Sequence, residues 1–95
     1  MFTAIFIAND QMAYGARLGL YRRGIRVPED VSLVGFDDLL ASAYTTPPLT
    51  TVRQPIFDIG SAAAQAILDL IERRPARLPD FATELIIRES AVLRR

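Results

Sequence analysis

The sequence predicts an α/β fold with a parallel sheet built from βαβ units, and three segments carry that prediction. Residues 31–38 form a short apolar run that ends in two carboxylates, which is typical of a buried strand. In α/β sheets, ligands bind beyond the carboxyl ends of such strands. Residues 2–8 are a second, almost continuously apolar run. Residues 12–23 lie between these runs and have helical spacing. Strand, helix and strand in this order make a parallel pair with a right-handed crossover.

The helix of this unit has clear boundaries and two apolar stripes. Asn9 and Asp10 follow the first strand, and the side chain of either residue can cap the helix. Gly24 suits the position just beyond the helix end. The stripe that should cover the sheet consists of Met12, Ala13, Ala16 and Leu20. The opposite stripe needs cover from the same domain or from a second subunit, and it consists of Tyr14, Leu18 and Tyr21.

The second half of the chain should add further elements. The run Thr46-Pro47-Pro48 prevents a regular helix, so residues 39–49 should be a loop or a short helix. Pro55 suits the first turn of a helix. The other predictions are a third strand at 50–53, a helix at 56–73, a last strand at 83–88 and a frayed tail at 90–95.

The predicted helix at residues 56–73 has a wide apolar face. Its polar residues cluster in one narrow arc, and an arc of roughly 200° is apolar or small. Buried parallel strands also need cover on both faces, which two helices cannot supply. We therefore expect a larger domain around these residues.

Composition excludes several classes of function. The chain contains no Cys, His or Lys, which excludes Cys nucleophiles, His general bases and the usual zinc sites. Basic and acidic residues both number 11, so the net charge gives no electrostatic footprint for nucleic acid. No apolar run is long enough for a membrane span, and no signal peptide is seen. We expect a cytoplasmic chain that is not an enzyme and has no catalytic residue, metal or cofactor.

Polar side chains follow three predicted strands at the points where those strands end. Asn9 follows the first, Asp37 the second and Gln54 the third. If the strands are parallel neighbours, these side chains lie along one edge of the sheet. Their donors and acceptors suit a polyhydroxylated molecule, with Asp37 accepting from vicinal hydroxyls. The alternative is that Asp37 only caps and solvates the loop. Asp38 should point in the opposite direction, so for Asp38 we expect only this capping and solvating role.

Four segments resemble a known family: IANDQMAYGA at residues 7–16, RVPEDVSLVGFDD at 26–38, PPLTTVRQP at 47–55 and LIIRES at 85–90. In order and spacing they look like the C-terminal third of the LacI/GalR family of bacterial transcriptional regulators. The family has an N-terminal helix-turn-helix domain, a hinge helix and a core with the type I periplasmic-binding-protein-like fold. That core has two α/β subdomains joined by three crossovers, and the effector binds in the cleft between them.

The resemblance implies that residues 1–95 are part of an effector-binding and dimerisation domain. Residues 1–52 would belong to the C-terminal subdomain, and the chain would cross over at residues 52–54. Residues 55–82 would pack with the N-terminal subdomain. Residues 83–95 would supply a return strand and a tail.

The resemblance also implies roles for single residues. Asn9 and Asp37 match effector-binding positions, and Gln54 matches a crossover position beside the cleft. Ile56 falls where some members place a residue of the pocket wall, and Asp10 is left as the helix N-cap. The implied dimer interface comprises Tyr14, Leu18, Tyr21 and Tyr44.

The expected function is therefore the sugar-type effector-binding and dimerisation portion of a LacI/GalR-like repressor. Its partners would be a sugar or related polyol and further copies of itself, in a homodimer or higher assembly. Without a helix-turn-helix, this chain would make no direct contact with DNA, and no membrane contact is expected. Two alternatives are a fragment of a periplasmic sugar-binding transport protein and a self-associating module without a ligand.

Overall fold

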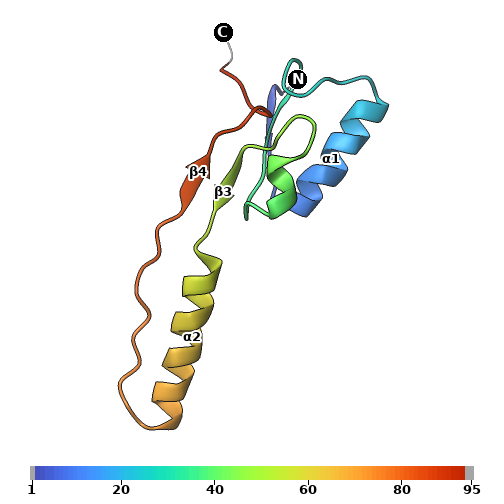
Figure 1. The fold of residues 1–95 in the computed structure, drawn as a ribbon. Helices are drawn as coiled ribbons and strands as arrows, with labels where there is room; N and C mark the ends of the chain where they lie inside the picture. The colour runs from blue at the N-terminus through green and yellow to red at the C-terminus, as the bar shows by residue number, and fades with distance from the viewer. Residues whose placement is uncertain (1, 94–95) are drawn as a thin grey trace. The chain divides into compact units, whose positions relative to one another are not determined.

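A computed structural model describes residues 2–93 and divides into two compact units (Figure 1). Met1, Arg94 and Arg95, the last two of which belong to the predicted tail, lie outside the described residues. The second unit spans Gln54–Thr83 and contains α2 (Ile56–Ile71). The first unit contains β1 (Ala4–Phe6), α1 (Asp10–Arg22), β2 (Ser32–Val34), the 3₁₀ helix η1 (Leu40–Ala43), β3 (Thr51–Arg53) and β4 (Glu84–Ile86).

The predicted βαβ unit is confirmed. β1 and β2 pair in parallel, with Ile5 opposite Leu33, and α1 connects them. Leu33 is 1% exposed and packs with Ala13 of α1 and with Leu49 in the core of the first unit. The small side chain of Ala13 lets α1 lie close to β2. The two elements bury their apolar faces against each other, and this burial stabilises the βαβ unit.

The boundaries of α1 follow from its flanking residues. The Asn9 side chain caps the helix, since its Oδ1 accepts a hydrogen bond of 2.9 Å from the Met12 N–H. The implied role of Asp10 as the N-cap is therefore wrong, and Asp10 is instead the first residue of the helix and is buried. Gly24 follows the last residues of the helix with φ of 73°, a conformation that glycine adopts without strain, as predicted.

The division of α1 into two opposite stripes is only partly correct. Met12, assigned to the stripe that covers the sheet, is 57% exposed. Tyr14, assigned to the opposite stripe, packs against the core cluster together with Ala16, so its cover comes from the same domain, one of the two alternatives for that stripe. The physical reason is that the Tyr14 hydroxyl finds a partner in Ser42, 2.6 Å away, so the ring can turn inward without losing a hydrogen bond.

β3 lies beside β2, and β4 lies beside β3. Two isolated parallel bridges, Val34 with Thr50 and Asp37 with Arg53, join the β2 and β3 regions. β3 and β4 pair antiparallel, with Val52 opposite Leu85. The segment between residues 38 and 50 contains η1 and otherwise follows an irregular path, in agreement with the predicted loop or short helix.

The segment after β4 differs from the frayed tail predicted from residue 90 onward. Ser90 is buried, and its hydroxyl donates to the Leu33 carbonyl at 2.5 Å and accepts from the Thr50 N–H at 2.8 Å. The Leu33 N–H also donates to the Ser90 carbonyl at 2.8 Å. The prediction of a frayed tail is wrong at Ser90, because this residue satisfies backbone groups of β2 on the side away from β1.

The second unit consists of α2 and the segment after it, which turns at the end of the helix and runs back along it (Figure 1). Ala66 is buried, but several large apolar side chains on α2 are more than half exposed. They are Ile56, Phe57, Ile67, Leu68, Leu70 and Ile71. The described residues thus leave much of the predicted wide apolar face uncovered. Neither α1 nor α2 has the length and apolar character that a membrane span requires.

Candidate functional site

The carboxyl ends of β1 and β2 meet at one edge of the first unit. The Asp10 N–H donates to the Phe36 carbonyl at 3.0 Å, and the Asp37 N–H donates to the Val52 carbonyl at 2.8 Å. Asn9 therefore sits beside the segment that follows β2, and Asp37 sits beside β3. This edge brings the predicted site residues Asn9 and Asp37 into one neighbourhood.

Asn9 has a structural bond and further hydrogen-bonding capacity. Its Oδ1 is occupied by the cap of α1. A side-chain amide also carries two N–H donors, which lie outside that cap bond. The cap fixes the side chain, so the donors are presented in a defined direction at the start of α1.

The turn that carries Asp37 has an unusual backbone. Asp37 has φ of 122° and Asp38 has φ of 55°, both in the left-handed half of conformational space. Aspartate tolerates this region better than most residues do, but two in succession remain costly. Hydrogen bonds hold the turn, because the Asp37 N–H reaches β3 and the Leu39 N–H donates to the Asp10 carboxylate at 2.8 Å. Such strain is common where a side chain must be presented to a ligand.

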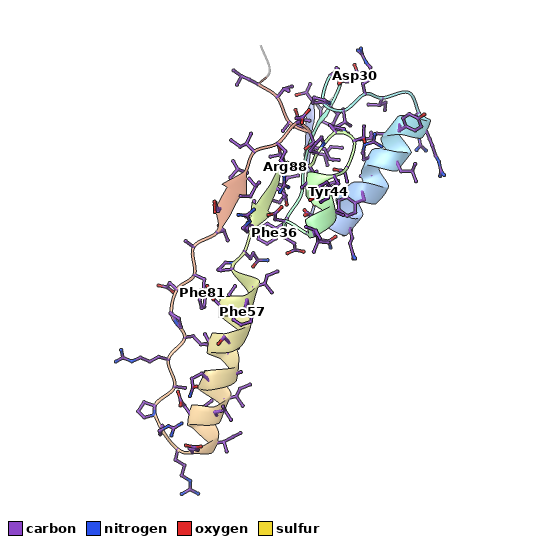
Figure 2. The ribbon with its side chains drawn as sticks, in the orientation of Figure 1. Asp30, Phe36, Tyr44, Phe57, Phe81 and Arg88 are labelled. Atoms are coloured by element: carbon purple, nitrogen blue, oxygen red, sulfur yellow. The ribbon has the colours of Figure 1, made fainter. Side chains whose placement is uncertain are left out.

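Asp38 does not solvate the loop, so that prediction is wrong. Its side chain is 6% exposed and accepts from Arg53 Nε and from Arg88 Nη2, each at 2.7 Å. Burial raises the pKa of Asp38, but the hydrogen bonds and charges of the two arginines outweigh burial and hold the pKa below its ordinary value. Arg88, which follows β4 and is labelled in Figure 2, also donates to the Leu49 carbonyl at 2.9 Å.

Asp10 organises this edge, and sequence reasoning missed that role. Its side chain is 0% exposed. One carboxylate oxygen accepts from the Thr51 hydroxyl at 2.6 Å, and the other accepts from the Leu39 N–H and from the Ser42 hydroxyl at 2.5 Å. The partners lie 29 to 41 residues away in the chain, so no local pattern marks this carboxylate as buried.

Two predicted pocket residues belong to the second unit. Gln54 opens that unit, and its carbonyl accepts from the Ile56 N–H at 2.9 Å. Ile56 is the first residue of α2, and its side chain is exposed. Their roles beside an effector remain predictions.

The residues assigned to a dimer interface differ in exposure. Leu18 and Tyr21 of α1 are exposed, and Tyr44 at the end of η1 is 77% exposed (Figure 2). Tyr14 is half-buried against the core. Three of the four side chains are thus available on the described surface for contact with another molecule.

Two hollows in the surface of the first unit lie away from the Asn9–Asp37 edge. One, of about 310 Å³, lies at the C-terminal end of α1, and a wider one, of about 690 Å³, lies beside Pro48 and Arg88. Neither is lined by Asn9 or Asp37. Over residues 2–93, no group of three His, Cys, Asp or Glu side chains is arranged to hold a metal ion.

Comparison with known proteins assigns the chain to a family. Residues 2–91 match the family described as periplasmic binding protein-like domain. The chain is 46% identical over 93 residues to the HTH-type transcriptional regulator GalR of Escherichia coli K12, which covers 94% of this chain and 26% of that protein.

Solved structures show the same relationship. The transcriptional regulator CelR–cellobiose complex matches with a TM-score of 0.84 and 40% identity, over 92% of this chain and 27% of that one. The LacI family transcriptional regulator from Lactobacillus casei with bound sucrose matches with a TM-score of 0.80 and 33% identity, over 93% of this chain and 33% of that one.

The relatives are longer proteins of one functional class. This chain spans about a quarter of the length of the curated relatives that it matches. Their names describe transcriptional repressors and regulators, in agreement with the expectation that the chain is not an enzyme. With the βαβ unit, the parallel strand ends and the family match in agreement, the chain belongs to the periplasmic binding protein-like domains of the LacI/GalR family of transcriptional regulators.

Proposed function

We propose that this chain is the effector-binding and dimerisation portion of a cytoplasmic LacI/GalR-type repressor, with a sugar or related polyol as effector. The first unit would supply one wall of the effector cleft, with Asn9 and Asp37 as contacts. Gln54 would lie at the crossover, and Ile56 would form part of the pocket wall. The observation that carries the proposal is the meeting of the β1 and β2 ends, which brings an amide and a carboxylate to one open edge.

The chemistry of these two groups suits a sugar. Each sugar hydroxyl can both donate and accept a hydrogen bond. The Asn9 amide supplies N–H donors, and the Asp37 carboxylate supplies acceptors whose bonds are strengthened by charge. Cellobiose and sucrose, bound in the two similar regulators, are of this chemical class and support a sugar as the effector.

The proposed subunit face is the surface formed by Tyr14, Leu18, Tyr21 and Tyr44. Tyrosine is enriched at protein interfaces because its ring buries a large area while its hydroxyl stays compatible with water. In the complete regulator, an effector would act by binding one arrangement of the core more tightly than another, which shifts the population between them.

The Asn9→Asp variant tests the effector contact separately from the helix cap. Aspartate caps helices as well as asparagine does and adds favourable charge at the N-terminus of α1, so the free energy of unfolding should be unchanged. The variant replaces the amide donors by an acceptor, so affinity for the sugar should fall about tenfold or more. Isothermal titration of the complete protein that carries this sequence, with cellobiose and with sucrose, measures the effect.

Two further variants complete this test. Asp37→Asn keeps a side chain that tolerates positive φ but removes the charge, so it should also weaken sugar binding about tenfold. Asp80→Asn makes the same change at an exposed position outside the proposed site and should leave binding unchanged. Equal affinities for the unchanged protein and for both site variants would contradict the assigned contacts.

The coding sequence upstream of these residues gives an independent test of the regulator assignment. A helix-turn-helix followed by a hinge helix would support it. A signal peptide in its place would instead support a sugar-binding transport protein.

A further inference from the structure

The buried carboxylate of Asp10 is bonded to the segments that carry both proposed effector contacts. Asp10 directly follows Asn9, the N-cap of α1. Leu39, whose N–H donates to Asp10, stands two residues after Asp37. Thr51, whose hydroxyl also donates to Asp10, lies in the strand that receives the Asp37 N–H. A buried carboxylate needs all of its donors, so these bonds hold both sides of the turn that presents Asp37.

A tyrosine hydroxyl extends this network toward the surface of α1. Tyr14 Oη lies 2.6 Å from Ser42 Oγ, and Ser42 Oγ lies 2.5 Å from Asp10 Oδ2. Ser42 has a single hydroxyl proton, and the carboxylate can only accept, so that proton points to Asp10. The Tyr14 hydroxyl is therefore the donor in its bond with Ser42. The result is a directed chain in which each hydrogen bond strengthens the next.

The hydroxyl of Tyr14 is not required by the other roles of this residue. Its ring packs against the core of the first unit, and the same ring belongs to the proposed subunit face. A phenylalanine ring would serve both purposes, because both depend on apolar area. The bond to the buried Ser42 hydroxyl is the feature that only tyrosine supplies.

We propose that Tyr14 is a positioning residue of the effector site. Its hydroxyl orients Ser42, Ser42 fixes the Asp10 carboxylate, and that carboxylate sets the places of Asn9 and Asp37. This inference rests on the proposed function, because it takes Asn9 and Asp37 as the effector contacts. It gives a residue assigned to the subunit face a second role at the ligand site.

The test uses Tyr14→Phe and Ser42→Ala, with Ser61→Ala as the control, in the complete protein that carries this sequence. Ser61→Ala removes one hydroxyl, as Ser42→Ala does, but Ser61 is exposed on α2 and lies outside the proposed effector and subunit surfaces, so it serves as the matched control. The readouts are the backbone amide NMR signals of Asp37 and Leu39, the affinities for cellobiose and sucrose, and self-association by sedimentation. Ser42→Ala breaks the same chain one step closer to Asp10 and should reproduce the effect of Tyr14→Phe.

We expect Tyr14→Phe to move the two amide signals and to weaken sugar binding about threefold to tenfold, with self-association unchanged. Ser61→Ala should leave the signals and the sugar affinity as they are. A hydroxyl with a purely structural role would lower the unfolding temperature without moving the Asp37 signal, and that result would overturn the proposal. If neither sugar binds the unchanged protein, the proposed function fails, and the amide signals alone decide for or against the positioning role.

Discussion

At the residue scale, the two adjacent aspartates after β2 serve different purposes. Asp37 stands at the edge where β1 and β2 end, on a backbone with φ of 122°. The Asp38 side chain is almost fully buried and bridges Arg53 of β3 to Arg88 beyond β4. The ion pairs of Asp38 hold the strained turn against two neighbouring segments. Because Asp37 lies in the same turn, these ion pairs also fix the position of Asp37.

Replacing Asp38 by Asn should destabilise the protein in a pH-dependent way. Asparagine tolerates positive φ but cannot pair with the arginines, so we expect a loss of about 2 kcal/mol in the free energy of unfolding at neutral pH. The pKa of Asp38 is lowered in the folded state, so its stabilisation is complete above the unfolded-state pKa of about 3.9. That stabilisation disappears as the pH falls through the lower folded-state pKa. Urea unfolding of the variant and of the unchanged protein, at pH 7 and near pH 3, measures the loss in the free energy of unfolding at each pH.

Asp80→Asn is the control for this series, since it removes a carboxylate from an exposed position. It should have the same small effect at both pH values. A penalty for Asp38→Asn that is equal at pH 7 and near pH 3 would contradict the role assigned to its charge.

Among single residues, the sequence predicts the positions of side chains that directly follow a strand. It does not predict the roles of side chains whose partners lie far away in the chain. Asn9 and Asp37 follow strand ends, which any reader of the sequence can locate. The pairing of Asp38 with Arg88 spans 50 residues. The sequence predicts a cap at Asp10, because a carboxylate at the start of a helix is usually an N-cap. The burial of the Asp10 carboxylate against Ser42 and Thr51 depends on tertiary structure, which short-range sequence patterns do not encode.

At the scale of elements, the approach of α1 to the end of β2 depends on one glycine. Gly35 follows β2 directly and is buried. A Cβ at this position would lie 2.3 Å from Asp10 Oδ1 and 3.0 Å from Leu49 Cδ2. The start of α1 can therefore lie against the end of β2 only while this residue has no side chain.

We expect Gly35→Ala to lower the free energy of unfolding by about 2 kcal/mol, because the added methyl group displaces the buried carboxylate. Gly15→Ala is the matched control, since a Cβ there would meet nothing within 4 Å. Gly15 lies inside α1, where alanine should instead stabilise the helix by up to about 1 kcal/mol. Urea unfolding followed by circular dichroism compares the two variants, and equal stability of Gly35→Ala and the unchanged protein would argue against the close approach.

The elements themselves were largely predictable, and their contacts were less so. Within residues 2–93, both α-helices and all four strands occur where the sequence predicts them, because apolar periodicity and flanking glycines or prolines are local signals. The faces of α1 were partly misassigned, since the inward turn of Tyr14 depends on Ser42 in another element. Ser90 was assigned to a frayed tail, although it bonds to the edge of β2. In both cases, hydrogen bonds between elements determine where the side chain lies.

At the scale of the whole molecule, α2 needs a partner that the described residues do not supply. Most of its large apolar side chains are exposed, and Ala66 is its buried residue. Exposed apolar area of this extent is typical of a surface covered in a larger assembly. This chain covers 26% of GalR and 27% of the CelR chain, so both relatives have further residues that this chain lacks.

The 95 residues by themselves should therefore self-associate through α2. Burial of apolar area drives the association, so a charge on the apolar face, Ile67→Glu, should shift the sedimenting species toward the monomer. Ser61→Glu places the same charge on the polar arc of the same helix and should leave the assembly unchanged. Sedimentation velocity over a range of concentrations separates these outcomes. A monomer that unfolds cooperatively for the unchanged chain would show that α2 is stable without a partner, and the wide apolar face would then need another explanation.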